Sequence, residues 1–331
     1  MATIHDVARL AGVSTSTVSR VLSRSRAVHP ESEAKVLAAA EELGYRHNAV
    51  ARALRTSRSH TIGMLVPQIS NPFFPALVEA VERRLDREGL VLFLCDSQRD
   101  AEVEARRLLA LVDRQVDGVI ITPFDATASV AAVRGVLGRL PVIQAIRCVE
   151  GSLTDWVGVD DETGFRLLVD HLVAAGRRRL VFVSAAPETN SSAQRRLDAV
   201  DAALRAHGLT AAQEPLLGRF EVDWGLDAAE RVDLSAVDGI VCGNDAIALG
   251  MLRGLRRAGV SVPGQVAVTG FDDISYAEIS DPPLTTVRQE WDALADACVR
   301  LLLHPSDDGP RCAAIAPTLQ VRESTPSLEA T

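Results

Sequence analysis

Lysine is almost missing from this sequence of 331 residues: Lys35 is the only one, and arginine supplies the rest of the 35 basic residues. A phosphate-binding loop needs a lysine after a glycine-rich turn, and a dinucleotide site needs Gly-x-Gly-x-x-Gly after its first strand. Neither pattern occurs, and the Gly-x-Ser-x-Gly elbow of many hydrolases is also missing. The sequence offers no motif for catalysis, and we expect a protein that is not an enzyme.

Cysteine and histidine are few and scattered. The five cysteines and seven histidines form no pair with the spacing of a metal or redox site, so we predict reduced thiols, no metal and no cofactor. No uncharged apolar run reaches the roughly 18 residues that span a bilayer. The first residues, MATIHDV, lack the basic and apolar regions of an export signal. We therefore expect a cytoplasmic protein that does not contact the membrane.

Positive charge is concentrated at one end of the chain. Residues 1–60 hold nine basic and five acidic side chains, a net charge of +4, whereas the remainder holds 26 basic and 39 acidic side chains. DNA phosphates attract the first part and repel the second. This asymmetry indicates a protein that meets DNA with its N-terminal end.

Two short helices are predicted between residues 3 and 22. Apolar residues recur from Ile4 at i, i+3, i+4 and i+7, which is one buried face of a helix. Gly12 can adopt the positive φ of a sharp turn, and Ser14 is a suitable cap for a second helix that begins at Thr15. The spacing is typical of a helix-turn-helix.

The second helix is predicted to expose a small, polar and basic face. In a helix-turn-helix the early residues of the second helix contact base edges and their neighbours hold phosphates. The predicted base-reading residues are Thr15, Ser16 and Arg20, and the predicted phosphate contacts are Thr17 and Ser19. The alternative is a helical bundle with a merely solvated polar face. A third helix over 31–43, with Val36, Leu37, Ala40 and Leu43 inward, would complete a domain of residues 1–46.

Short apolar runs alternate with amphipathic stretches from residue 61 onward. Alternation of strands and helices predicts parallel sheets covered by helices on both faces. The span is long for one sheet, so we expect two doubly wound α/β subdomains. The predicted boundaries are 61–160 with 287–320 for the first subdomain and 161–286 for the second, within a core of 61–331.

The chain resembles the LacI/GalR family of bacterial transcription regulators. The resemblance rests on TIHDVARLAGVSTSTVSRVL, VHPESEAKVLAAAEELGY, NAVARALRTSRSHTIG, GFDD and PPLTTVRQ, which follow the family's order over nearly the whole chain. It implies a helix-turn-helix head and a core that is similar to periplasmic binding proteins.

The segment 47–60 between the head and the core is rich in arginine and small residues. Read alone it is a solvated linker, because so short a helix does not hold in water. The resemblance implies a hinge helix that orders on DNA and inserts a pair of leucines into the minor groove. The residues implied are Leu54 as the wedge, Ala51 at the close approach, and Asn48, Arg52 and Arg55 as groove or backbone contacts.

Aromatic and polar side chains follow several of the predicted strands. Ligands of parallel sheets bind beyond the carboxyl ends of strands, and aromatic faces with a few polar groups suit a sugar. Phe220 and Asn190 belong to this set by position. The resemblance further implies Phe73, Phe74, Arg196, Asn244, Asp272, Gln289 and Trp291 as effector contacts. Ile146 stands where many relatives carry Asp, and Asn190 where purine-responding relatives carry Arg, so a purine is disfavoured.

We therefore predict a sequence-specific transcription regulator of the repressor type that binds double-stranded operator DNA and, between its subdomains, a small effector, a sugar or sugar derivative. The tail, RESTPSLEAT, lacks the apolar heptads of a coiled coil, so a homodimer is expected. The alternatives are a sugar-binding receptor of the periplasmic type and a sugar-metabolising enzyme with a DNA-binding head.

Overall fold

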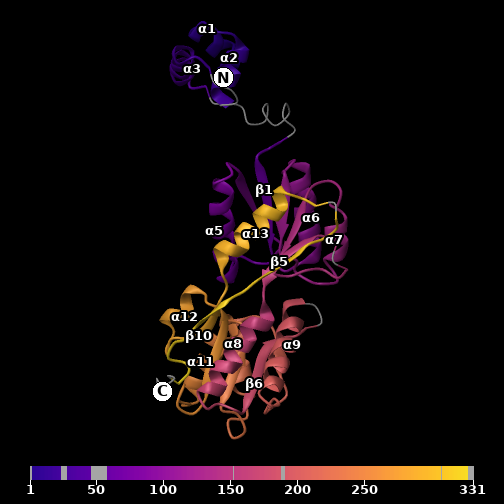
Figure 1. Cartoon of the computed structure of the whole chain (residues 1–331), viewed down its shortest axis with the longest axis vertical. Coiled ribbons are helices and arrows are strands. Elements are labelled where there is room, and N and C mark those ends of the chain that lie inside the picture. Colours follow the sequence, from indigo (N-terminus) through magenta and orange to yellow (C-terminus); the bar gives the residue numbers. More distant parts are fainter. Residues whose placement is uncertain are drawn as a thin grey trace. The chain divides into compact units, whose positions relative to one another are not determined.

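The computed structural model describes residues 2–23, 28–45, 58–151, 153–187, 191–306 and 308–326. The chain separates into two compact units, Met1–Ser59 and His60–Thr331 (Figure 1). Within the described residues, no helix has both the length and the apolar character needed to cross a membrane.

The smaller unit contains three described helices, α1 (Ile4–Ala11), α2 (Thr15–Ser23) and α3 (Pro30–Glu42). Thr3 begins α1 with a capping box, in which its hydroxyl accepts from the Asp6 N–H while the Asp6 carboxylate accepts from the Thr3 N–H. Gly12 ends α1 at φ 66°. The Ser14 hydroxyl then accepts from the Thr17 N–H at 3.1 Å, as the predicted cap requires.

The core of this unit is made by one apolar residue row from each helix. Val7, Val18 and Val36 are fully buried, and Ala39 and Ala40 pack beside them. The prediction that Leu37 faces inward was wrong, because Leu37 is 50% exposed and the small Ala39 takes the inward position. Close approach of α1 and α3 is thus built on alanine.

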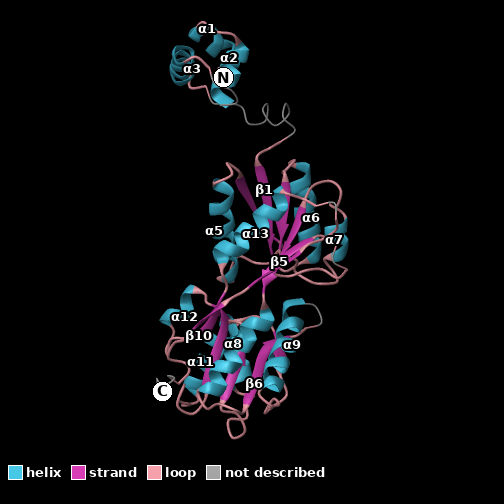
Figure 2. Ribbon diagram, viewed as in Figure 1, coloured by secondary structure: helices cyan, strands magenta, loops and turns pink. Residues whose placement is uncertain are grey.

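The larger unit contains two six-stranded sheets (Figure 2). The first sheet has the order β11-β5-β4-β3-β1-β2 and the second has the order β12-β10-β9-β8-β6-β7. Neighbouring strands are parallel except for β10 and β12, which are antiparallel. The predicted fold, two doubly wound parallel sheets and a helical head, is confirmed.

The strands of the first sheet are β1 (Thr61–Val66), β2 (Val91–Asp96), β3 (Gly118–Ile121), β4 (Val142–Ala145), β5 (Asp155–Val159) and β11 (Cys312–Ile315). Its helices are α5 (Phe73–Asp86), α6 (Ala101–Asp113), α7 (Val130–Arg134) and α13 (Trp291–Leu303). Helices α5 and α13 pack on one face and α6 and α7 on the other, so both faces of the sheet are buried.

The strands of the second sheet are β6 (Leu180–Ala185), β7 (Leu216–Gly218), β8 (Gly239–Cys242), β9 (Ala267–Asp272), β10 (Thr285–Arg288) and β12 (Thr318–Gln320). Its helices are α8 (Asp161–Ala174), α9 (Ser191–Ala206), α10 (Val222–Ala229), α11 (Asp245–Arg257) and α12 (Ser275–Ile279). Helices α8 and α9 cover one face, and α10, α11 and α12 cover the other.

The chain passes between the two subdomains three times, after β5, after β10 and between β11 and β12 (Figure 1). The predicted first-subdomain segment 287–320 is therefore only partly right. It contributes α13 and β11 to the first sheet, but β10 continues the parallel order beyond β9 and β12 pairs with β10 at the edge of the second sheet. Three chain connections therefore join the two subdomains.

Candidate functional site

The polar face of α2 carries the residues that the sequence predicts as DNA contacts. Ser16 and Arg20 are exposed, and Thr15 and Thr17 are partly exposed. The Ser14 hydroxyl lies 2.7 Å from the Ser16 hydroxyl and 2.9 Å from that of Thr17, which orders the start of the helix. The opposite face packs into the core through Val18. Helix α2 is thus held by its packing and its N-terminal cap, and it exposes hydroxyl and guanidinium donors to solvent.

The predicted hinge contacts, Asn48, Ala51, Arg52, Leu54 and Arg55, lie outside the described residues. The same holds for Asn190, the predicted effector contact that precedes α9. These predictions stay untested.

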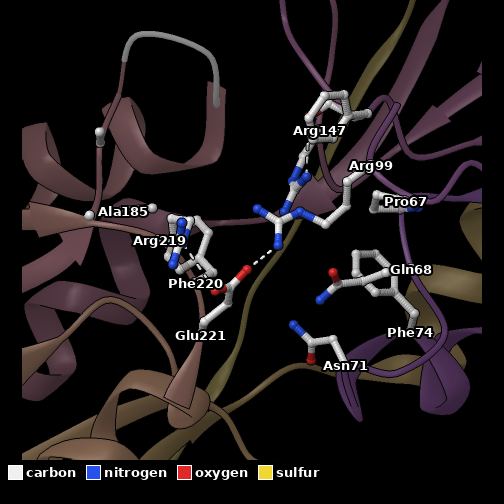
Figure 3. Close-up of a pocket in the computed structure, with 13 residues that line it drawn as sticks. Pro67, Gln68, Asn71, Phe74, Arg99, Arg147, Ala185, Arg219, Phe220 and Glu221 are labelled. Atoms are coloured by element: carbon white, nitrogen blue, oxygen red, sulfur yellow. Dashed lines mark hydrogen bonds and ion pairs between the residues drawn. The ribbon is translucent and has the colours of Figure 1, made fainter. Parts of the chain in front are cut away.

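A cavity of about 230 Å³ lies between the two subdomains, at the carboxyl ends of their strands (Figure 3). An adjoining space of about 30 Å³ extends it toward α9 and shares part of its lining. Both sheets reverse their strand order here, β1 against β3 in the first and β6 against β8 in the second. Such switch points are where open α/β sheets bind ligands.

Arg196, on the inner face of α9, lines the smaller space and is only 4% exposed. Its Nε lies 3.1 Å from Oδ1 of Asp161, and its Nη2 lies 3.6 Å from Oδ1 of Asp272. The guanidinium stacks on Phe271, with its carbon 4.4 Å from the ring centroid. Two carboxylates and a ring face hold this cation in one orientation.

Asp272 ends β9 with its backbone at φ 117°, which non-glycine residues rarely adopt. Burial raises the pKa of its carboxyl group to about 7, and the neighbouring Arg196 opposes that rise. The Gln289 amide donates to Asp272 Oδ1 at 2.7 Å. The Gln289 Oε1 atom is buried and has no partner among the described residues. Strain and unmatched polar groups at one point are typical of a binding site.

Aromatic side chains from both subdomains line the smaller space. Phe73 and Phe74 begin α5 and meet edge to face, with their centroids 5.0 Å apart. Trp291 packs edge to face on Phe73 at 4.9 Å from behind. Phe220 lies on the opposite subdomain and lines both spaces.

Three of the predicted effector residues, Asn244, Gln289 and Trp291, support the structure around the cavity. Gln289 and Trp291 do not line the cavity but contact the lining residues Asp272 and Phe73. Asn244 does line it, and its side-chain oxygen also caps α11 by accepting from the Ile247 N–H at 3.0 Å. The amide nitrogen of Asn244 therefore remains the group to offer a ligand.

Six polar or charged residues that line the larger cavity were not predicted from the sequence: Gln68, Asn71, Arg99, Arg147, Arg219 and Glu221. Arg147 follows β4 directly after Ile146, so the rule that ligands meet residues after strands could have found it. Arg99 and Glu221 form an ion pair across the cavity (Figure 3), which joins the two subdomains in this state. Arg99 and Glu221 are 122 residues apart in the sequence, so no local sequence pattern predicts that they pair.

Comparisons with known proteins agree with this architecture. Residues 3–48 match the family model described as "Bacterial regulatory proteins, lacI family", and residues 169–325 match the "Periplasmic binding protein-like domain". Over 92% of its length the chain is 35% identical to the ribose operon repressor of Escherichia coli strain K12, covering 93% of that protein. The chain belongs to the LacI family. It is a DNA-binding transcription regulator, as its helix-turn-helix predicts.

Solved structures of LacI-family regulators have the same fold. The lac repressor dimer bound to operator and the anti-inducer ONPF is similar at a TM-score of 0.86 and 25% identity, over 98% of this chain and 99% of that one. A LacI-family regulator from Enterococcus faecium with bound ribose is similar at 0.69 and 29% identity, over 80% and 98%. The LacI-type head sets this chain apart from a stand-alone sugar-binding receptor.

Proposed function

We propose that this LacI-family regulator represses transcription and that its effector is a small sugar or sugar derivative bound between the subdomains. The observation that carries the proposal is the buried pair of Arg196 and Asp272 beside aromatic rings. A guanidinium offers a fixed fork of donors and a carboxylate offers two acceptors, so together they bind neighbouring hydroxyl groups. The apolar faces of a sugar ring fit against Phe73, Phe74 and Phe220.

Cavity size favours a compact ligand. The volume of about 230 Å³ lies below the roughly 300–1,000 Å³ of drug-sized sites, which suits a monosaccharide better than a disaccharide. The ribose named for the repressor of Escherichia coli and for the Enterococcus regulator is of this size class.

Effector and operator are coupled through the hinge in this proposal. A ligand that contacts both subdomains changes their separation, and with it the separation of the two hinge segments in a dimer. The hinge then orders or melts on DNA, with Leu54 as its minor-groove wedge, Ala51 at the close approach, and Asn48, Arg52 and Arg55 as contacts. Because the two sites are linked, operator DNA must change effector affinity by the same factor.

An exposed edge of the first sheet supports a homodimer. Strand β2 lies at the edge of the first sheet and exposes Val91 (57%), Phe93 (44%) and Leu94 (42%). A hydrophobic edge strand left open invites pairing, and a second copy of the chain would cover it. Two copies also supply the paired α2 helices that an operator with two half-sites requires.

Operator selection followed by titration tests the function. The full chain should select a near-palindromic duplex from a random pool, and Arg20→Ala should weaken binding to it by about 1–3 kcal/mol while random DNA is bound as before. Lys35→Ala, an exposed α3 position paired only with Glu31 among the described side chains, is the matched control. If Arg20→Ala and Lys35→Ala behave alike, α2 does not read bases.

The absence of turnover is part of the proposal. The lining residues contain no nucleophile with an adjacent base among the described side chains. Incubation of the protein with each candidate sugar, followed by chromatography of the recovered ligand, should return it unchanged. Conversion of any of them would reopen the enzymatic alternative.

A further inference from the structure

The cavity wall carries more positive than negative charge. Arg99, Arg147 and Arg219 line it, and Glu221 is the one carboxylate among its described lining residues (Figure 3). Arg99 and Arg219 both form their ion pair with Glu221. A single carboxylate is thus shared by two guanidiniums, and the third has no share in it.

Arg147 is that third guanidinium. Within the described part of the chain its one hydrogen bond goes to the Phe124 carbonyl at 3.4 Å, and it forms no ion pair. A guanidinium has five N–H donors, so this partly buried group is poorly satisfied. Burial, followed by the charges of Arg196 and Arg99, lowers the pKa of Arg147 to about 10, which leaves it protonated at neutral pH.

The neighbouring Arg196 shows what a compensated cation looks like in the same fold. Its charge is matched by the Asp161 carboxylate, the Asp272 carboxyl group lies beside it, and its ring contact shields it further. Arg147 has the apolar Ile146 beside it instead, and both residues line the smaller space. The two arginines line the same small space but differ in compensation, since one is paired with a carboxylate and the other is not.

Resting on the proposed effector function, we propose that the effector is an anionic sugar derivative whose phosphate or carboxylate group binds Arg147, with Arg99 and Arg219 nearby. Its hydroxyl groups meet Arg196 and Asp272 in the adjoining smaller space. An anion supplies the acceptors that Arg147 lacks, and hydrogen bonds between ionised partners are about twice as strong as neutral ones. A neutral sugar would leave the excess positive charge of the cavity wall unmatched.

Titration calorimetry on the full-length protein tests this proposal with four probes: ribose, ribose 5-phosphate, ribonate and inorganic phosphate. We expect one or both anionic sugars to bind at least about tenfold more tightly than ribose, the gain of one charge-assisted hydrogen bond. The comparison of ribose 5-phosphate with ribonate distinguishes phosphate from carboxylate. The gain should shrink as ionic strength rises.

Two cavity variants assign the effect. Arg147→Gln removes the charge and should erase the preference for the anionic sugar. Ile146→Asp places a carboxylate beside Arg147 and should also erase it. Ile146 adopts φ 66°, a conformation that Asp tolerates better than a β-branched residue, and circular dichroism checks that this variant keeps the fold. Arg139→Gln, at an exposed position away from the cavity, is the control and should keep the preference.

Each outcome decides one claim. Equal or tighter binding of ribose than of both anionic sugars, or an anion preference that survives in Arg147→Gln and Ile146→Asp, overturns the anion site. Binding of inorganic phosphate that depends on Arg147, with no sugar bound, keeps the anion site and removes the proposed sugar effector. Absence of binding by all four probes overturns both.

Discussion

The substitution Asp272→Asn tests the electrostatics of the cleft. The carboxyl group is 3% exposed, and burial raises its pKa to about 7 from 3.8. Asparagine has nearly the same shape, and its carbonyl oxygen can still accept from the Gln289 amide. The variant therefore removes a titrating proton and leaves the packing of β9 in place.

The sign and size of the effect follow from proton linkage. Between pH 4 and 7 the folded protein holds the Asp272 proton that the unfolded chain has released, so the free energy of unfolding falls as pH rises. A change of about three pKa units corresponds to about 4 kcal/mol, fully expressed above pH 7. The asparagine side chain has no proton to release, so the free energy of unfolding of Asp272→Asn lacks this decrease with pH. Its stability relative to the native sequence should therefore improve by up to about 4 kcal/mol between pH 4 and pH 8.

Urea unfolding followed by circular dichroism at pH 4 and pH 8 measures this difference directly. Burial also raises the pKa of Glu104, which is common to both proteins and cancels in the comparison. The pKa of Asp245 is raised by burial and then by the charge of Asp272, so the variant relieves part of that rise and the change adds to the expected difference with the same sign. Asp227→Asn, at an exposed position on α10, is the control and should show no such pH trend. If the difference in free energy of unfolding between variant and native protein stays constant with pH, or if the variant is relatively less stable at pH 8, Asp272 is ionised and stabilised by Arg196.

Three further predictions follow from the packing and from the proposed coupling. Arg196→Ala should remove the effector response in calorimetry but spare operator affinity in the folded protein, and loss of this buried cation should cost about 3–5 kcal/mol in urea unfolding; an unchanged response removes Arg196 from the site. Leu54→Ala should weaken binding to operator far more than binding to random DNA in a fluorescence titration, and equal losses refute the wedge. Gly250→Ala should lower the melting temperature, because its Cβ would lie 2.0 Å from the Val222 carbonyl oxygen where α10 meets α11. Gly135→Ala, at φ −63° with nothing closer than 3.4 Å, should melt as the native protein does.

Strands that are buried on both faces are predictable from this sequence because they are continuous runs of apolar residues. Strand β1, Thr61–Val66, begins at residue 61, where the alternating apolar runs are predicted to start, since a run of buried residues admits few alternatives. Strand β12, Thr318–Gln320, falls outside the predicted bounds of the second subdomain because it is three residues long, partly exposed, and placed by its pairing with β10. The prediction for Leu37 was wrong although the residue fits the apolar pattern of a buried helix face. Helix α3 packs against α1 through alanines instead, and this packing cannot be read from the periodicity of one helix.

The site is partly predictable for the same reason. Asp272 and Phe73 stand directly at the end of a strand or the start of a helix, where the topology of an α/β sheet brings ligands. The charge balance of the cavity is different, because it depends on which distant carboxylates meet which arginines. Arg99 reaches Glu221 across the cleft while Arg147 reaches no carboxylate among the described residues. Such pairing is decided by the closed tertiary structure.

The central claim is that the ligand in the cleft controls DNA binding by α2. Fluorescence anisotropy of the full-length protein with its selected duplex, in excess random DNA and with or without saturating ribose, ribose 5-phosphate or ribonate, tests it most directly. We predict a preference for the selected duplex of at least about 10³ and a change of at least about fivefold in its affinity with one of the ligands. Binding that shows no preference for any duplex, or that no ligand bound in the cleft alters, would contradict the account.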